Sequence, residues 1–467
     1  MENKLKIGRE KAEKYSYYLI FFSILIASGY YISELNHLSL WGDELWLLYH
    51  SDAGYSELFK PGYLVNENYP TVIILYKLAS SLMGSPEPNT LVWINFFNVF
   101  LILIACYVLR KNFKLDELVL FVALLVSSEY FLRTLFEIKT AGFSLGLSSI
   151  FSAYYLKHYL LRGEKEFYLT LIVGLALSTI HPFSGLFVCS CFFIMFFYSE
   201  GLKKYFLILS FFIPILFLLT YSTFSFLEAG DFWLTMDFRR IYNTGGYIVP
   251  FVVLCLLSLL NETKNKFKHL KEHILILAPV ILSLAILLGY SYAIKPIYQA
   301  RYFITFFPLA CFFFLLINRD YFDRNKLFLL SVCLISVIFF YGPRSMVPYT
   351  NYGDLIVKSH YKECAEYPIF FNKTESPGLR SYFDITFNMA SKIYSPNYQR
   401  KLISYNKFIK SIKTNSECKV IGISGQMSQD LFKKDMDKDL EKLGLSVRSE
   451  PAEGCLKKGC GLIWYIN

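Results

Sequence analysis

The chain of 467 residues is 54% hydrophobic and 18% aromatic, has a mean hydropathy of +0.38, and carries a formal net charge of +10. Its apolar residues come in long blocks, which excludes an ordinary soluble protein and indicates a polytopic α-helical membrane protein. Many of the cations lie in short loops between these blocks, so membrane topology explains the basic excess better than nucleic-acid binding does, and we expect no nucleic-acid partner.

The first apolar block runs from Tyr15 to Ser33 and follows a polar N-terminal stretch that contains five cations. Because cationic flanks favour the cytoplasmic side of a membrane, the N-terminus is predicted to be cytoplasmic. A cleaved signal peptide is the alternative, but the block is long for that role and no clear small-residue cleavage site follows it.

Further apolar blocks follow, and the shorter ones need flanking residues to reach the roughly 20 residues that cross the hydrocarbon layer. Together with the first block they predict about 11 transmembrane helices, with the cationic loops on the cytoplasmic side and the C-terminus outside. Cysteines inside the blocks are expected to be packing residues. The further blocks are 91–109, 118–131, 140–160, 167–180, 183–198, 205–221, 247–260, 273–290, 301–317 and 327–341.

An acidic pair, Asp43 and Glu44, follows the first block between Trp41 and Trp46. Tryptophan favours the membrane–water interface, so the carboxylates are expected at the bilayer surface. A carboxylate there can remove the proton of a sugar or serine hydroxyl within hydrogen-bond reach. From the pair alone, a solvated loop with two adjacent charges stays open as the alternative.

The rest of the first outer loop, about residues 34–90, ends in a short apolar run, Thr71–Met83, preceded by Tyr69 and Pro70. At 13 residues the run is too short to span a bilayer comfortably, so we expect a helix that lies along the membrane surface.

The composition changes after Gly342-Pro343, which predicts a transmembrane domain over 1–341 and a soluble extracytoplasmic domain over 342–467. Strand-like runs at 367–371, 419–424 and 462–466 alternate with helix-like runs at 378–394 and 429–443, a pattern typical of a small α/β domain.

The C-terminal domain contains four cysteines that are candidates for two disulfides, because an oxidising compartment permits them. A zinc site is the alternative, but the spacing lacks the short Cys-x-x-Cys pairs that such sites use. The four are Cys364, Cys418, Cys455 and Cys460.

Several short motifs resemble those of the GT-C superfamily of integral-membrane glycosyltransferases, both in their order along the chain and in their expected position on the same side of the membrane. The resemblance is to the family 39 type, which includes protein O-mannosyltransferases and the lipid A aminoarabinose transferase, and it covers about Tyr15–Ile317. The motifs are Leu40-Trp41-Gly42-Asp43-Glu44, Asn68-Tyr69-Pro70, Glu137-Ile138-Lys139, Thr179-Ile180-His181, and Ala300-Arg301-Tyr302 with Pro308.

The chain departs from the family pattern at three places. Lys139 stands where the family typically has arginine, Thr140-Ala141 replaces a frequent Pro-Tyr, and Glu67-Asn68-Tyr69-Pro70 replaces the usual His-Pro-Pro. The family's contacts to the donor headgroup are therefore not carried over to this chain.

The resemblance implies transfer of a sugar, with inversion, from a polyprenyl-phosphate-linked donor to a hydroxyl of a lipid, polysaccharide or protein acceptor at the outer face. Compact loops favour the bacterial plasma (inner) membrane, with the endoplasmic reticulum as the alternative, and in either case membrane lipid is a partner. The family's first acid usually acts as general base, so Asp43 is the predicted base, with Glu44 beside it.

The leaving group in such a reaction is a lipid phosphate, so cations at the outer rim are expected to neutralise its charge. Arg301 is the first candidate because a guanidinium binds phosphate oxygens bidentately, and Lys139 and His181 come second. A snorkelling arginine and a histidine that caps a turn are the respective alternatives for Arg301 and His181.

Four further residues are candidates for binding or positioning the acceptor: Glu137, Tyr69, Arg239 and Arg240. A structural ion pair with Lys139 is the alternative for Glu137, and a solvated loop is the alternative for the two arginines. Some relatives use a divalent cation near the acids, but the sequence offers no ligand cluster that requires one, so no metal and no cofactor is assigned.

Two other functions stay open. The first is a flippase or transporter of lipid-linked glycans, although such proteins usually place ionisable groups in mid-membrane or show repeat symmetry, whereas the charges here gather at one surface. The second is a membrane assembly protein that keeps the fold without catalysis.

Overall fold

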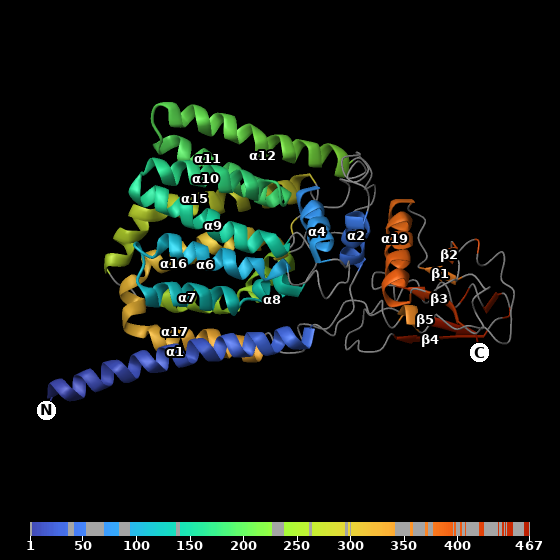
Figure 1. Cartoon of the computed structure of the whole chain (residues 1–467), viewed down its shortest axis with the longest axis horizontal. Coiled ribbons are helices and arrows are strands. Elements are labelled where there is room, and N and C mark those ends of the chain that lie inside the picture. Colours follow the sequence, from blue (N-terminus) through green and yellow to red (C-terminus); the bar gives the residue numbers. More distant parts are fainter. Residues whose placement is uncertain are drawn as a thin grey trace. The chain divides into compact units, whose positions relative to one another are not determined.

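The computed structural model is mainly helical over the residues that it describes (Figure 1). The chain divides into two compact units. The helical unit comprises Met1–Ser33, Ser56–Leu75 and Leu91–Gly342, and the mixed unit comprises Glu34–Tyr55, Tyr76–Thr90 and Pro343–Asn467. The described residues are 2–35, 42–52, 70–83, 94–136, 141–226, 238–260, 264–294, 298, 300–340, 355–357, 369–371, 377–395, 397, 402–403, 407, 420–424, 438, 441–442, 444, 446–451 and 462–466.

Each apolar block predicted from the sequence contains a helix. The helical unit holds most of α1 (Glu2–Leu35) and the start of α4 (Pro70–Met83), followed by α6 (Phe97–Leu109), α7 (Leu115–Val126), α8 (Glu129–Phe136), α9 (Ala141–Leu161), α10 (Glu164–Ser178), α11 (Pro182–Tyr198), α12 (Leu202–Phe226), α13 (Phe238–Tyr247), α14 (Val249–Leu260), α15 (Lys264–Ala293), the 3-10 helix η2 (Ala300–Thr305), α16 (Phe307–Ile317) and α17 (Arg319–Phe340).

Length and composition identify one helix, among the described residues, that can cross a bilayer unaided: His273–Ala293 within α15. The predicted number of about 11 spans therefore stays a prediction, because the other apolar helices are shorter or more polar. The shorter apolar helices are Thr71–Leu82, Phe97–Leu109, Pro182–Tyr198, Val249–Ser258 and Phe307–Ile317. The six cysteines in the apolar blocks are free, and four of them are buried, as packing residues should be.

Helices α6 and α9 approach each other closely at Gly146. The Asn98 side chain is fully buried, and its Oδ1 accepts a hydrogen bond of 3.1 Å from the backbone N–H of Gly146. A Cβ atom on Gly146 would lie 2.4 Å from Asn98 Oδ1 and 2.9 Å from Asn98 Cα. Glycine is therefore required here so that the two backbones can meet.

Replacing Gly146 with alanine is expected to destabilise the protein by about 1–3 kcal/mol, because the added methyl group has to displace backbone atoms. Gly289, in the interior of α15, is the matched control: a Cβ there meets nothing within 4 Å, so Gly289→Ala should be neutral or stabilising. Thermal unfolding of both variants in detergent tests this, and a Gly146→Ala variant as stable as Gly289→Ala would contradict the packing argument.

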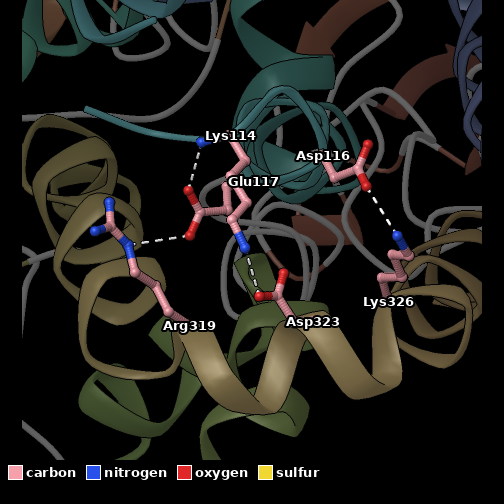
Figure 2. A network of polar contacts seen from close by, with 6 residues as sticks. All are labelled: Lys114, Asp116, Glu117, Arg319, Asp323 and Lys326. Atoms are coloured by element: carbon pink, nitrogen blue, oxygen red, sulfur yellow. Dashed lines mark hydrogen bonds and ion pairs between the residues drawn. The ribbon is translucent and has the colours of Figure 1, made fainter. Parts of the chain in front are cut away.

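Ion pairs join the start of α7 to the start of α17 (Figure 2). Lys114 Nζ lies 2.6 Å from Asp323 Oδ2, Arg319 Nε lies 3.1 Å from Glu117 Oε1, and Lys326 Nζ lies 3.0 Å from Asp116 Oδ2. The hydrogen bond to Asp323 raises the pKa of Lys114, and the hydrogen bond to Asp116 raises the pKa of Lys326.

This charged network brings together two of the loops that were predicted to share the cytoplasmic side. Exposed ion pairs contribute only about 0.2–1 kcal/mol each, but Glu117 is 4% exposed, so removing its partner would leave a buried charge. The network follows the end of α16, whereas η2 precedes the start of that helix, so the two regions lie at opposite ends of α16. That arrangement agrees with the predicted alternation of loops, and the side of the membrane on which each lies stays a prediction.

The mixed unit contains a five-stranded sheet with the order β2-β1-β3-β5-β4. β1 pairs in parallel with β2 and β3, and β5 pairs antiparallel with β3 and β4. Helix α19 (Pro377–Tyr394) contacts β1 and also packs against α2 (Gly42–Asp52), which belongs to the predicted first outer loop. The strands are β1 (Ile369–Phe371), β2 (Leu402–Ile403), β3 (Val420–Ser424), β4 (Val447–Pro451) and β5 (Leu462–Ile466).

The sequence predicted three of these strands and helix α19, but it missed the two edge strands. β2 is two residues long, and β4 reads Val-Arg-Ser-Glu-Pro, in which charges and a terminal proline mask the strand pattern and suit an edge. The mixed unit includes residues 34–55 and 76–90 as well as 343–467, and the predicted domain boundary at residue 342 stays a prediction. The four cysteines of the tail lie outside the described residues, so the predicted disulfides stay a prediction.

Candidate functional site

The acidic pair lies in the first turn of α2, not in an irregular loop. Glu44 is 6% exposed, so the solvated-loop alternative is wrong for that residue. Negative charge near a helix N-terminus is favoured by the exposed N–H groups and the helix dipole, which explains why a helix starts here. Asp43 belongs to the same helical turn, and its side chain is outside the described part.

Helix α2 is held within the mixed unit at its sides and at its C-terminal end. Leu45, Leu47 and Leu48 are buried, and α19 packs alongside the helix (Figure 1). At the far end, Lys77 Nζ donates a hydrogen bond of 3.1 Å to the carbonyl oxygen of Ser51. A cation at a helix C-terminus complements the dipole, so α2 has acids at its start and an ammonium group at its end.

A second group of predicted residues gathers around η2 in the helical unit. Helices α9, α11, α13 and α16 all contact this 3-10 helix, whose second residue is Arg301. Tyr302, the next residue, is buried with its ring centroid 4.2 Å from that of Phe183 and 5.1 Å from that of His181. The structure therefore brings Tyr302, the neighbour of Arg301 in the chain, into contact with His181, which lies far away in the sequence.

His181 is the N-cap residue of α11. Its Nδ1 accepts a hydrogen bond of 3.2 Å from the backbone N–H of Phe183, and Pro182 occupies the first helical turn. The capping alternative raised by the sequence is thus confirmed. Because Nδ1 is the acceptor, a neutral imidazole carries its hydrogen on Nε2.

Arg239 and Arg240 lie in helix α13 and not in a loop, and their role in acceptor binding stays a prediction. Helix α13 contacts both η2 and α8, and the hydroxyl groups of Thr244 and Tyr298 are hydrogen-bonded to each other. This contact joins the helix that carries the two arginines to the segment that leads into Arg301.

Three predicted site residues, Tyr69, Glu137 and Lys139, lie outside the described residues, so their roles stay predictions. Asp43 and Glu44 belong to the mixed unit, whereas His181, Arg239, Arg240 and Arg301 belong to the helical unit.

The sequence did not single out the residues that hold η2. Tyr130 donates a hydrogen bond to the carbonyl oxygen of Ala300, and Ser184 Oγ lies 3.3 Å from Thr305 Oγ1. The only sequence signal for this contact is a tyrosine within an apolar segment. Its hydroxyl group needs a hydrogen-bond partner, but the sequence does not show which residue that partner is.

A metal site is not formed by the described residues, which contain no cluster of three or more histidines, cysteines or acids. At the charged network, a shallow pocket of about 220 Å³ is lined by Lys111, Asn112, Phe113, Lys114, Glu117 and Arg319. Because this pocket lies at the end of α16 remote from η2, it is separate from the candidate site.

No known protein-family model and no curated protein matches the chain. Among solved structures, it is similar to the crystal structure of ArnT from Cupriavidus metallidurans in the apo state, with a TM-score of 0.53 at 10% sequence identity. The match covers 97% of this chain and 98% of the ArnT chain. The chain therefore has the fold of ArnT, so the resemblance predicted from its motifs is confirmed as far as the fold is concerned.

Proposed function

We propose that the chain is an inverting membrane glycosyltransferase that moves a sugar from a polyprenyl-phosphate-linked donor to an acceptor hydroxyl at the outer face of a bacterial plasma membrane. The observation that carries the proposal is the ArnT-like fold over 97% of the chain. The motifs at the acidic pair, His181 and Arg301 add to it, because they supply the groups that such a transfer requires.

The reaction is a single displacement. Asp43 accepts the proton of the acceptor hydroxyl while the hydroxyl oxygen attacks the anomeric carbon of the sugar. The bond from that carbon to the lipid phosphate breaks, and the electron pair leaves with the phosphate. Arg301 neutralises the departing phosphate, and His181 donates a hydrogen bond to it through Nε2.

Burial of Glu44 favours a supporting role for that carboxylate. Arg239 and Arg240 serve acceptor binding in this proposal, since α13 packs directly against η2.

The direct test supplies membranes that contain the protein with a set of polyprenyl-phosphate sugars and follows each labelled sugar. Formation of a new glycosidic bond in a lipid, polysaccharide or protein fraction supports the transferase. Movement of the lipid-linked sugar across the bilayer without a new bond would indicate a flippase instead. If neither occurs with any donor, an assembly role becomes the better description.

Substitutions of His181 separate its capping role from its proposed contact with phosphate. His181→Ala should lose about 1 kcal/mol of stability with the helix cap, whereas asparagine is a strong N-cap residue and should restore it. Transfer should fall by about tenfold or more in both variants, because neither side chain reproduces the imidazole Nε2–H. Thermal unfolding and initial transfer rates are measured together, and an asparagine variant with wild-type rates would show that capping is the whole role of His181.

A further inference from the structure

Several helices contact η2, the turn that carries Arg301. The peptide between Ala300 and Arg301 is fixed by a hydrogen bond from the buried side chain of Tyr130. The hydroxyl group of Tyr130, on α8, donates a hydrogen bond to the carbonyl oxygen of Ala300. That carbonyl and the N–H of Arg301 belong to the same peptide unit, which is planar. Fixing the carbonyl therefore fixes the orientation of the backbone at the point where Arg301 begins.

Tyr130 is itself rigidly placed. It is 1% exposed, its ring stacks on Tyr247 of α13 with centroids 5.0 Å apart, and it meets the edge of Phe307 at 6.0 Å. Aromatic contacts of this kind stabilise one ring orientation and so one position of the hydroxyl group. The neighbouring contacts agree with this role, because Tyr302 packs against Phe183 on the other side of Arg301.

We propose that Tyr130 is a positioning residue for Arg301: through the Ala300 carbonyl it sets the backbone from which the guanidinium approaches the donor phosphate. The proposal rests on the proposed function, in which Arg301 binds that phosphate. A phenylalanine at the same place would keep the ring contacts with Tyr247 and Phe307 and lose the hydrogen bond to Ala300.

Tyr130→Phe is the test variant, and Tyr17→Phe is its matched control. Tyr17 is also 1% exposed, and its hydroxyl also donates to a backbone carbonyl distant in sequence, that of Asp116 at 2.6 Å, near the charged network. Both variants should lose similar, small amounts of stability. Transfer should fall by about tenfold in Tyr130→Phe, the factor that corresponds to one lost hydrogen bond, and should stay within about twofold of wild type in Tyr17→Phe.

Two further readouts separate positioning from a general structural effect. In an Arg301→Lys background, Tyr130→Phe should lower transfer by less than about twofold, because residues that act through one another are not additive. Hydrogen–deuterium exchange of the peptide over 298–306 should rise in Tyr130→Phe and not in Tyr17→Phe, since the carbonyl anchor of this turn is lost.

An equal tenfold loss in the Arg301→Lys background, or unchanged exchange over 298–306, would overturn the proposal while leaving the proposed function intact. If the wild-type protein transfers no sugar at all, the proposed function fails, and the exchange comparison alone then decides whether Tyr130 holds the Arg301 turn. Faster exchange in that case supports the anchor, and unchanged exchange overturns it.

Discussion

Asp43→Asn is expected to lower sugar transfer by at least about 100-fold, the lower range of what a positioned proton acceptor contributes. The substitution keeps the size of the side chain and replaces a carboxylate with an amide, which cannot accept the hydroxyl proton. Asparagine is also well tolerated at the start of a helix, so α2 should still form.

Asp52→Asn is the matched control for this variant, because Asp52 is the last residue of the helix whose first turn contains Asp43. Both proteins should reach the membrane in equal amounts and unfold at similar temperatures, and only Asp43→Asn should lose transfer. Initial rates with saturating lipid-linked donor provide the comparison. Wild-type turnover in Asp43→Asn would remove Asp43 as the base and direct attention to Glu44.

Arg301→Ala is expected to lower transfer by about 100-fold to 1,000-fold, the range found when one group that stabilises developing negative charge is removed. Arg301→Lys keeps the charge but loses the planar fork that binds two phosphate oxygens, so it should recover only part of the activity. A snorkelling arginine would behave differently, because lysine reaches the membrane surface equally well.

Rates over a range of donor concentrations separate the two explanations for Arg301. A role in stabilising the leaving phosphate lowers kcat, whereas loss of donor binding alone raises KM with kcat unchanged. Arg324→Ala serves as the control, since Arg324 is exposed on α17 near the charged network. Equal rates for Arg301→Ala and Arg324→Ala would exclude a phosphate role for Arg301.

Helices could be predicted from the sequence wherever an apolar block was long, because burial in lipid or in a helical core requires nothing more specific than apolar side chains. Interruptions inside the blocks were harder to predict. The block over 301–317 begins as a 3-10 helix before Phe307, and α8 is a separate helix after Ser128. These breaks depend on tertiary contacts such as that of Tyr130 with Ala300, which no local pattern encodes.

The sequence predicted those parts of the candidate site that lie in local motifs, but not the residues that support them from other elements. Motifs around Asp43, His181 and Arg301 are local, and each falls at a helix start or in a short 3-10 helix, where polar groups are expected. The supporting residues Thr244 and Tyr298 belong to stretches with no distinctive composition. Their role appears only when α13 and η2 are packed together.

Packing of α19 against α2 also constrains how the chain can evolve. The acid-bearing helix is covered by a helix encoded far downstream, so substitutions on the facing sides of the two helices have to compensate each other across that distance. A C-terminal domain joined by a flexible linker could be exchanged for an unrelated domain without compensating substitutions. Here an exchange of the C-terminal residues would remove the helix that packs against α2. We therefore expect α2 and α19 to be inherited together when relatives recombine.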